Sequence, residues 1–265
     1  MSSLTTLATV KAFLNITNTT QDALIPFLIA RASDQIQRWT ERTFPIVTNI
    51  NRRINGTGTA RIVLPDSPIL AVSALQIYGT TVPASSDGIE SGYLFDADAI
   101  TLVGSCGHSP SYDIFPKGYS NVKCSWTAGY QSSQTSFVPT GNVPTLTPTE
   151  GGTAITNISV TNVTTGALMT EVGSSPAINQ YSFSAGVYTF NASNTGVQVT
   201  MAYYYVPASI EQACIELIAL KLKSRDNIGV KSKSLAGESI TYDDTNMSKP
   251  IQGMLQPFRK TWASL

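Results

Sequence analysis

The sequence has little charge for its length. Lys, Arg, Asp and Glu make up only 13% of the 265 residues, about half the usual share for a soluble globular protein, and 17 basic side chains balance 17 acidic ones. Ser and Thr together account for 61 residues, so hydroxyl groups supply much of the polar surface. A net charge of zero argues against a general affinity for nucleic acid through bulk charge.

Cysteine and long apolar runs are also scarce. The three cysteines are widely spaced and contain no C-x-x-C, which argues against a disulfide scaffold or a zinc site and favours a reducing compartment. No run of about 18 apolar residues predicts a membrane span, and the N-terminus lacks the pattern of a secretory signal. The hydrophobic share of 42% is nevertheless sufficient for a folded core in one or two domains.

The few charges are unevenly distributed along the chain. The charged residues of segment 131–206 are Glu150 and Glu171, and it has no basic residue, whereas the segments on both sides carry charges of both signs. This composition predicts an inserted Thr/Ser-rich β-domain at 131–206 within a discontinuous core of residues 1–130 and 207–265. The expected fold class is therefore α+β, a helical bundle with a small antiparallel sheet plus a sandwich-like all-β insertion.

Helical periodicity marks both ends of the chain. Apolar residues recur at helical spacing from Leu24 to Trp39, and this helix should stop before Pro45, with Thr19 and Asp22 resembling a capping box at its start. A short helix is expected over residues 4–14. After Pro207 the apolar stripe returns, and it is wide enough to predict a helix buried on most sides, packed on the helix at 20–42. An extended arm at 229–244 and a last helical stretch at 251–262 should follow.

Strand patterns fill the middle. Ile46, Ile50 and Ile54 share one parity before the turn Asn55-Gly56, and further strands are expected at 61–64, 72–78, 93–102 and 121–127. Residues 131–150 resemble a linker. Five alternating segments then predict a small sandwich or barrel, at 155–163, 167–172, 180–183, 187–190 and 197–205.

Candidate catalytic residues are sparse. A hydrolase would have to use Asp96, Asp98 and the single histidine, His108. We favour another interpretation, in which the two aspartates flank a turn and the histidine lies in a surface loop. Cys124 and Cys214 lie at apolar positions, which predicts buried thiols rather than nucleophiles. No phosphate-loop, dinucleotide, nucleophile-elbow or zinc-protease motif occurs. We expect no enzyme activity, no cofactor and no metal.

Two weak basic groups stand out. The first is Arg52 and Arg53 before the hairpin turn, with Arg61 on the strand after it. The second follows the helix expected after Pro207 and consists of Lys221, Lys223, Arg225, Lys231 and Lys233. Each group is either a nucleic-acid-facing patch or a solvated surface, and a ring of subunits would multiply either patch.

Four stretches, in this order, resemble the head–tail connector (adaptor) proteins of tailed bacteriophages. The first is the helix at 22–44, which ends in WTERTF. The second is IVLPDSPI followed by VSALQIY, at 62–78. The third is CSWTAGY at 124–130, and the fourth is MLQPFRK at 254–260. The Val-Pro and helix that normally follow the third stretch closely arrive here at 206–213, after the 131–206 insertion. The resemblance covers about 190 residues, and it says nothing about the insertion.

The resemblance implies a structural virion protein, made in the bacterial host cytoplasm and located at the neck. Such adaptors form a dodecameric ring below the portal protein, extend the channel for double-stranded DNA without sequence specificity, and receive a stopper or tail-terminator protein. Their C-terminal segments engage the portal, and the positions in this chain that match are Ile251, Met254, Leu255, Phe258, Arg259 and Trp262. Arg52, Arg53, Lys231 and Lys233 are the candidates for the channel wall.

Two other interpretations stay open. The terminal apolar cluster, instead of binding a portal, can pack on its own parent domain. The whole chain can also be a phage or cell-surface binding module, in which the Thr-rich β-region contacts a receptor, a glycan or a neighbouring coat protein.

Overall fold

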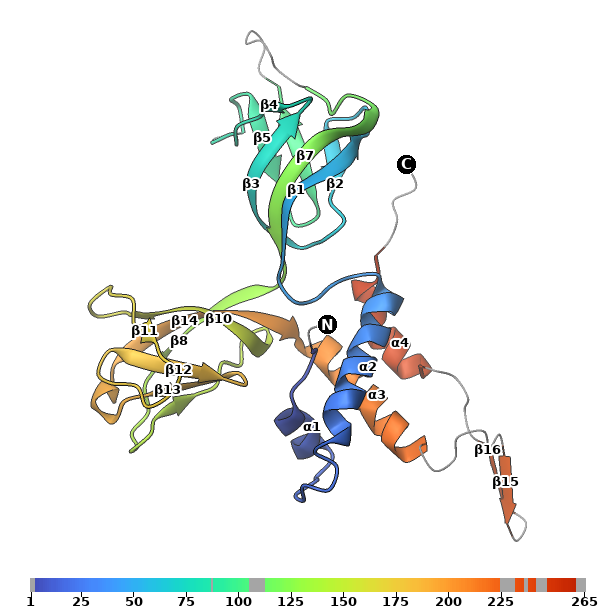
Figure 1. The fold of residues 1–265 in the computed structure, drawn as a ribbon, viewed down its shortest axis with the longest axis vertical. Coiled ribbons are helices and arrows are strands. Elements are labelled where there is room, and N and C mark those ends of the chain that lie inside the picture. The colour runs from blue at the N-terminus through green and yellow to red at the C-terminus, as the bar shows by residue number, and fades with distance from the viewer. Residues whose placement is uncertain are drawn as a thin grey trace. The chain divides into compact units, whose positions relative to one another are not determined.

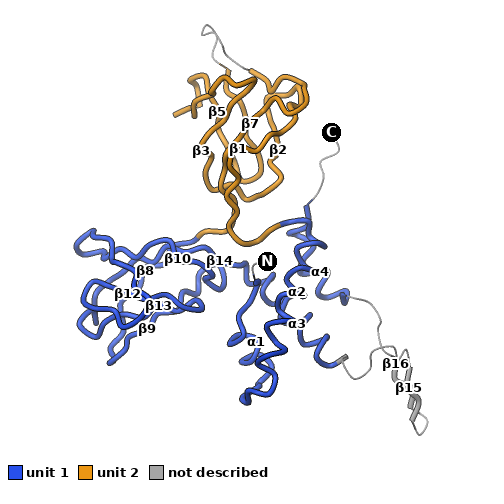
Figure 2. Tube along the Cα trace, viewed as in Figure 1, with its two compact units in different colours: residues 1–42, 132–265 blue, residues 43–131 orange. Residues whose placement is uncertain are grey.

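The computed structural model describes residues 3–86, 88–104, 113–224, 232–235, 238–241 and 247–260. The chain divides into two compact units, one formed by residues 1–42 and 132–265 and the other by residues 43–131 (Figure 2). Helices and antiparallel sheets both contribute, which confirms the α+β class (Figure 1).

Four α-helices of the described residues belong to the first unit. They are α1 (Leu7–Phe13), α2 (Leu24–Thr40), α3 (Ala208–Ser224) and α4 (Lys249–Leu255), with a 3-10 turn, η3 (Gln256–Phe258), after the last. The long helix α3 packs against α2 and α4, and α1 packs on α2. Seven of the eleven residues from 208 to 218 are buried, which agrees with the wide apolar stripe in this segment.

Local chemistry determines where these helices begin and end. The Thr6 side chain caps α1 by accepting the backbone N–H of Thr9. Helix α2 ends at Glu41, whose φ of 54° places it in the left-handed region. The capping box expected from Thr19 and Asp22 is absent, because α2 begins after Ala23 and Asp22 instead pairs with Lys11 at 2.6 Å.

A β-sandwich completes the first unit. One sheet has the order β10-β14-β8, from β8 (Gln131–Phe137), β10 (Gly152–Asn162) and β14 (Gln198–Pro207). The other has the order β11-β12-β13-β9, from β9 (Thr145–Leu146), β11 (Thr170–Glu171), β12 (Gln180–Ser184) and β13 (Val187–Phe190). A 3-10 turn, η1 (Ala192–Asn194), precedes β14.

The two sheets of the sandwich share one core. Tyr188 and Phe190 of one sheet and Met201 and Tyr203 of the other are all essentially buried in it. Asn157 joins the sheets, donating to the Tyr181 hydroxyl at 2.7 Å and accepting from the Tyr188 hydroxyl at 3.0 Å. The aromatic core therefore has its buried phenol groups hydrogen-bonded, as buried polar groups require.

The predicted linker at 131–150 is wrong at its start, because residues 131–137 form β8. This strand has the sequence QSSQTSF, whose alternation is between exposed and half-buried positions rather than between polar and apolar residues. Ser132 and Gln134 lie at the half-buried positions, so the strand has no hydrophobic periodicity to detect. Its pairing with β14 supplies the structure that its own sequence does not signal.

The second unit contains two small sheets around one core. A four-stranded sheet has the order β1-β7-β3-β4, from β1 (Val47–Gly56), β3 (Ile69–Ile77), β4 (Thr80–Thr81) and β7 (Gly118–Ala128). A three-stranded sheet has the order β2-β6-β5, from β2 (Arg61–Val63), β5 (Gly92–Phe95) and β6 (Ala99–Val103). Both contribute to a core that contains Trp126, Leu75, Ile100 and Phe115.

A β-bulge in β1 breaks the predicted parity of its isoleucines. The register with β7 shifts between Asn49 and Arg52, and Asn51 has a φ of 53°. As a result Ile50 is 74% exposed, while Ile54 packs against the core. An inserted residue reverses the face of every later side chain, which an alternation argument cannot anticipate.

The hairpin of β15 (Ser232–Leu235) and β16 (Glu238–Thr241) occupies the segment expected to be an arm. The domain boundaries expected from composition differ from the observed division, since 132–206 groups with the helices and 43–131 is the other unit. The inserted domain at 131–206 stays a prediction, although its strands have a core of their own.

Candidate assembly surfaces

The sandwich and the helices of the first unit meet around one buried carboxylate. Glu211, in the first turn of α3, is only 8% exposed. Its Oε1 accepts a hydrogen bond from the Thr5 hydroxyl at 3.0 Å, and its Oε2 accepts one from the Thr153 hydroxyl of β10. The N-terminal segment is fixed a second time, because the backbone N–H of Leu4 donates to Ser33 Oγ of α2 at 3.0 Å.

A cavity of about 430 Å³ opens beside this carboxylate. Threonine hydroxyls from the start of α1, the segment before β10 and β10 itself line it, together with the β12–β13 turn at Ala185 and Gly186. Glu211 holds both of its oxygens on protein hydroxyls, so the cavity has no uncompensated charge that calls for a ligand. Its chemistry is that of a junction rather than of an active site.

Sequence reasoning missed this junction. Glu211 looks like an ordinary acidic residue in a first helical turn, where it suits the helix dipole. Thr5 and Thr153 are two of 32 threonines and carry no local signal. Only the tertiary structure brings together groups that are 206 and 58 residues apart.

The predicted portal-binding residues divide into two classes. Ile251 and Leu255 of α4 are completely buried, as expected if the terminal apolar cluster packs on its parent domain. Met254 and Phe258 are half-buried and Arg259 is exposed, with its guanidinium over the Trp39 ring at 5.3 Å.

The end of this C-terminal segment is also fixed to the helices. The backbone N–H of Lys260 donates to the Thr40 carbonyl at 2.9 Å. Trp262, the last of the predicted portal-binding residues, lies outside the described residues.

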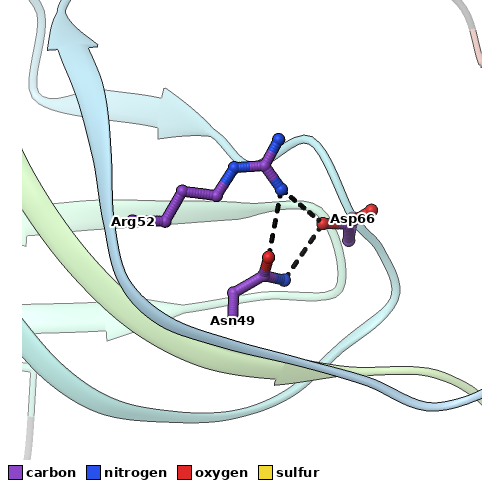
Figure 3. A network of polar contacts seen from close by, with 3 residues as sticks. All are labelled: Asn49, Arg52 and Asp66. Carbon is purple, nitrogen blue, oxygen red and sulfur yellow. Dashed lines mark hydrogen bonds and ion pairs between the residues drawn. The ribbon is translucent and has the colours of Figure 1, made fainter.

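Arg52 takes part in a polar network of the second unit (Figure 3). Its Nη1 donates to Asp66 Oδ2 at 3.1 Å and to Asn49 Oδ1 at 3.0 Å, and Asn49 Nδ2 donates to the same Asp66 oxygen at 3.0 Å. The guanidinium also lies 5.8 Å from the centre of the buried Trp126 ring. These contacts neutralise the charge of Arg52 and connect β1 to the turn after β2.

The other predicted channel residues are placed differently. Arg53 is exposed and lies opposite Lys123 of β7 in the sheet register. Lys231 lies outside the described residues, and of Lys233 only the backbone, in β15, is described. The two cations at Arg53 and Lys123 are thus the basic pair that the described sheet brings together.

The residues considered for hydrolysis do not form a site. The Asp96 carboxylate accepts the backbone N–H groups of Asp98 and Ala99, both at 2.9 Å, and pairs with Arg61 at 2.8 Å. The Asp98 N–H is the largest of the causes that lower the pKa of Asp96, ahead of Ala99 and Arg61. This is the chemistry of a closed turn between β5 and β6, while His108 lies outside the described residues.

Both predicted buried thiols are confirmed. Cys124 is 1% exposed and Cys214 is fully buried, and burial raises the pKa of each thiol to about 12. Cys106 lies outside the described residues. No group of three or more metal-ligating side chains is found within the described ranges. None of the helices in those ranges is both long and apolar enough to cross a membrane.

Two family models match different parts of the chain. Residues 4–80 match the phage gp6-like head-tail connector protein family, and residues 131–261 match the head completion protein family. The second match includes the sandwich together with α3 and α4 and runs across the predicted boundary at 206. No curated protein matches the sequence.

A solved structure described as the neck of an empty GTA particle computed with C6 symmetry has a TM-score of 0.38 and 12% identity to this chain, covering 99% of this chain and 96% of that one. The two family matches agree with the resemblance found in the sequence motifs. Both families are structural proteins of the phage particle and not enzymes. The chain is therefore similar to phage head–tail connector proteins over residues 4–80 and to head completion proteins over residues 131–261.

Proposed function

We propose that this chain is a ring-forming adaptor that binds below the portal, extends the DNA channel and provides the docking site for a stopper or tail protein. The two family matches, to a head–tail connector and to a head completion protein, carry this proposal. The helices packed around α3 form the helical core of the adaptor, and a dodecameric closed ring sums many individually weak contacts between subunits.

The portal contact is assigned to the outer side of the C-terminal segment. Ile251 and Leu255 hold α4 on α3, so they position the contact rather than make it. Met254, Phe258 and Arg259 retain exposed surface within six residues of the chain. A methionine, an aromatic ring and an arginine are typical of interface anchors. Trp262 completes the segment in the sequence.

The channel wall is assigned to a surface of low net charge. Arg53 offers an exposed cation to passing phosphate groups, while the charge of Arg52 is compensated by Asp66. Lys231 and Lys233 are the other cations proposed for the wall. The formal net charge of the whole chain is zero. A ring built from such subunits lets DNA pass without holding it, because phosphate binding grows with the number of cations engaged.

Electron microscopy of the purified protein with and without its portal tests the proposal. We expect rings that cap the portal. Met254→Glu and Phe258→Glu should abolish portal binding while the circular dichroism of the protein stays unchanged. Gly253→Ala is the matched control on the same helix, because a Cβ there meets nothing within 4 Å. A stable monomer that ignores the portal and binds a glycan or receptor would instead support the surface-module interpretation.

A further inference from the structure

Strand β8 is an unprotected sheet edge. It ends the order β10-β14-β8, so among the described strands only β14 pairs with it. Its seven residues contain no charge and no proline, and Phe137 at its end is 62% exposed. A strand of this length with free backbone N–H and C=O groups is a template for another strand unless charge, proline, a bulge or a cover prevents the pairing.

The other edges of the sandwich carry such protection. β9 and β11 are two residues long. β10 has two register shifts, and near its end the backbone of Met169 donates to the Val160 carbonyl, which covers part of its outer edge. Short length, bulges and covering chain are the usual means by which edges avoid pairing.

The second unit protects its edges in the same ways. β1 is bulged and carries Arg52 and Arg53, and β2, β4 and β5 are at most four residues long. Among the described sheets of the two units, β8 therefore stands out as the long edge that the fold leaves open.

The geometry of β8 shows which of its backbone groups face the open edge. Val138 donates its N–H to the Val197 carbonyl, and the Thr135 and Thr200 hydroxyls meet at 2.8 Å, so β8 runs antiparallel to β14. Since N–H directions alternate along a strand, the N–H groups of Ser133 and Thr135 point away from β14. The side chains at 133 and 135 are exposed as well.

The hairpin of β15 and β16 has no third strand beside it within the described residues. Its two four-residue strands pair with each other and, within the described residues, with no other strand. An isolated two-stranded hairpin is at best marginally stable in water and needs a third strand or a packed face. In the sequence, residues 225–231 join it to α3 and residues 242–248 join it to α4.

We propose that the β15–β16 hairpin of one subunit adds to the β8 edge of the next subunit, so that a five-stranded sheet crosses each subunit boundary. The inference rests on the ring of the proposed function. In a closed ring each β8 edge pairs with the hairpin of one neighbouring subunit, and each hairpin pairs with the β8 edge of the other. A heterologous contact of this kind therefore leaves no unpaired β8 edge in the ring. Strand addition supplies main-chain hydrogen bonds and depends little on side-chain identity, which suits the Ser-, Thr- and Gln-rich sequence of β8.

Ser133→Pro is the diagnostic variant. It removes one N–H from the open edge and leaves the ladder to β14 intact, and proline is tolerated at an edge position whose N–H is not used by the sheet. Ser133→Ala is the matched control, since it removes the same hydroxyl and keeps the N–H. We expect Ser133→Pro to raise the concentration for half-maximal ring assembly on the portal about tenfold, and Ser133→Ala to leave it unchanged.

A second variant tests the proposed occupant of the edge. Replacing residues 232–241 by a short Gly-Ser segment should weaken assembly at least as much, and adding Ser133→Pro to this replacement should have no further effect, because both remove the same contact. Independent, additive effects of the two changes would overturn the assignment of the hairpin.

Cross-linking then distinguishes pairing between subunits from pairing within one subunit. In a Cys106→Ser background, cysteine is introduced at 133 or 135 and at 232 or 241. Neighbouring strands lie about 4.8 Å apart, within the range of a disulfide. Covalent multimers are expected, and cross-linked monomers alone would overturn the inference. Wild-type rings that Ser133→Pro leaves intact would also overturn it, whereas a wild-type protein that forms no ring would refute the proposed function itself.

Discussion

The carboxylate of Glu211 is predicted to hold the N-terminal segment, the sandwich and α3 together. Thr5 and Thr153 each donate a hydroxyl to it, and both residues and the carboxylate are at least half-buried. The informative perturbation is Thr153→Val, which keeps the shape of the side chain and leaves one carboxylate oxygen without its donor. Thr5→Val likewise removes the hydroxyl that donates to the other oxygen of Glu211.

The magnitude follows from the charge and burial of the acceptor. A hydrogen bond to a charged group contributes about 1.5–3 kcal/mol, and a buried acceptor that loses its donor costs about 1–3 kcal/mol. We therefore expect Thr153→Val to destabilise the first unit by about 2 kcal/mol. At about 2–4 °C per kcal/mol for a unit of this size, Tm should fall by about 4–8 °C.

The assay is a double-mutant cycle of Thr153→Val and Glu211→Ala, measured by urea unfolding and by amide hydrogen exchange in α3 and β10. Coupling between the two changes should be about 1.5–3 kcal/mol, because removing either partner already removes their contact. Glu216→Ala is the control on the same helix. Its side chain is half-buried, and within the described residues its carboxylate accepts an amide donor from Gln212 at 2.9 Å, so we expect a change of about 0.5 kcal/mol or less.

The result that would refute this reasoning is additivity. If the two changes destabilise the protein independently, the hydroxyl–carboxylate contact contributes nothing and the burial of Glu211 has another cause. Unchanged exchange in β10 after Glu211→Ala would likewise show that the carboxylate does not connect the helix to the sandwich.

Two further predictions concern backbone space and thiol chemistry. Gly56→Ala should destabilise the second unit by more than about 2 kcal/mol, because the new Cβ would lie 1.9 Å from the Pro116 carbonyl oxygen. Gly79→Ala should cost about 1 kcal/mol, because its Cβ meets open space but the φ of 83° is unfavourable for alanine. Urea unfolding of the two variants compares these costs. In a Cys106→Ser variant, Cys124 and Cys214 should resist a thiol reagent at pH 8, since burial raises their pKa to about 12 and keeps them neutral. In the unfolded protein these thiols ionise near pH 9, so their contribution to the free energy of unfolding is full below pH 9 and is lost as the pH rises from 9 to 12. Rapid labelling of the native protein, or a free energy of unfolding that does not change between pH 9 and 12, would contradict this.

Strongly patterned segments could be predicted from the sequence. The helices at 24–40 and 208–224 follow apolar stripes at helical spacing, and the alternation of Val199, Met201 and Tyr203 puts these side chains in the sandwich core, where they are found. A pattern of this kind is a local property, because the face that each residue takes depends only on its spacing along the element.

Segments without such a pattern could not be predicted in this way. β8 has no apolar alternation, and its strand conformation depends on β14, 60 residues away in the chain. The bulge in β1 exposes Ile50 through a register shift that only the partner strand β7 defines. Both departures depend on long-range pairing, which local propensity does not encode.

The sequence by itself determined the α+β class, the absence of recognisable catalytic motifs and the motif order of the connector family. The tertiary structure decided which residues can act. It buried Ile251 and Leu255, neutralised Arg52 with Asp66, brought two threonines onto the carboxylate of Glu211, and left β8 as an open edge. The physical reason is that burial, charge pairing and edge exposure are properties of neighbours in space, and those neighbours come from distant parts of the chain.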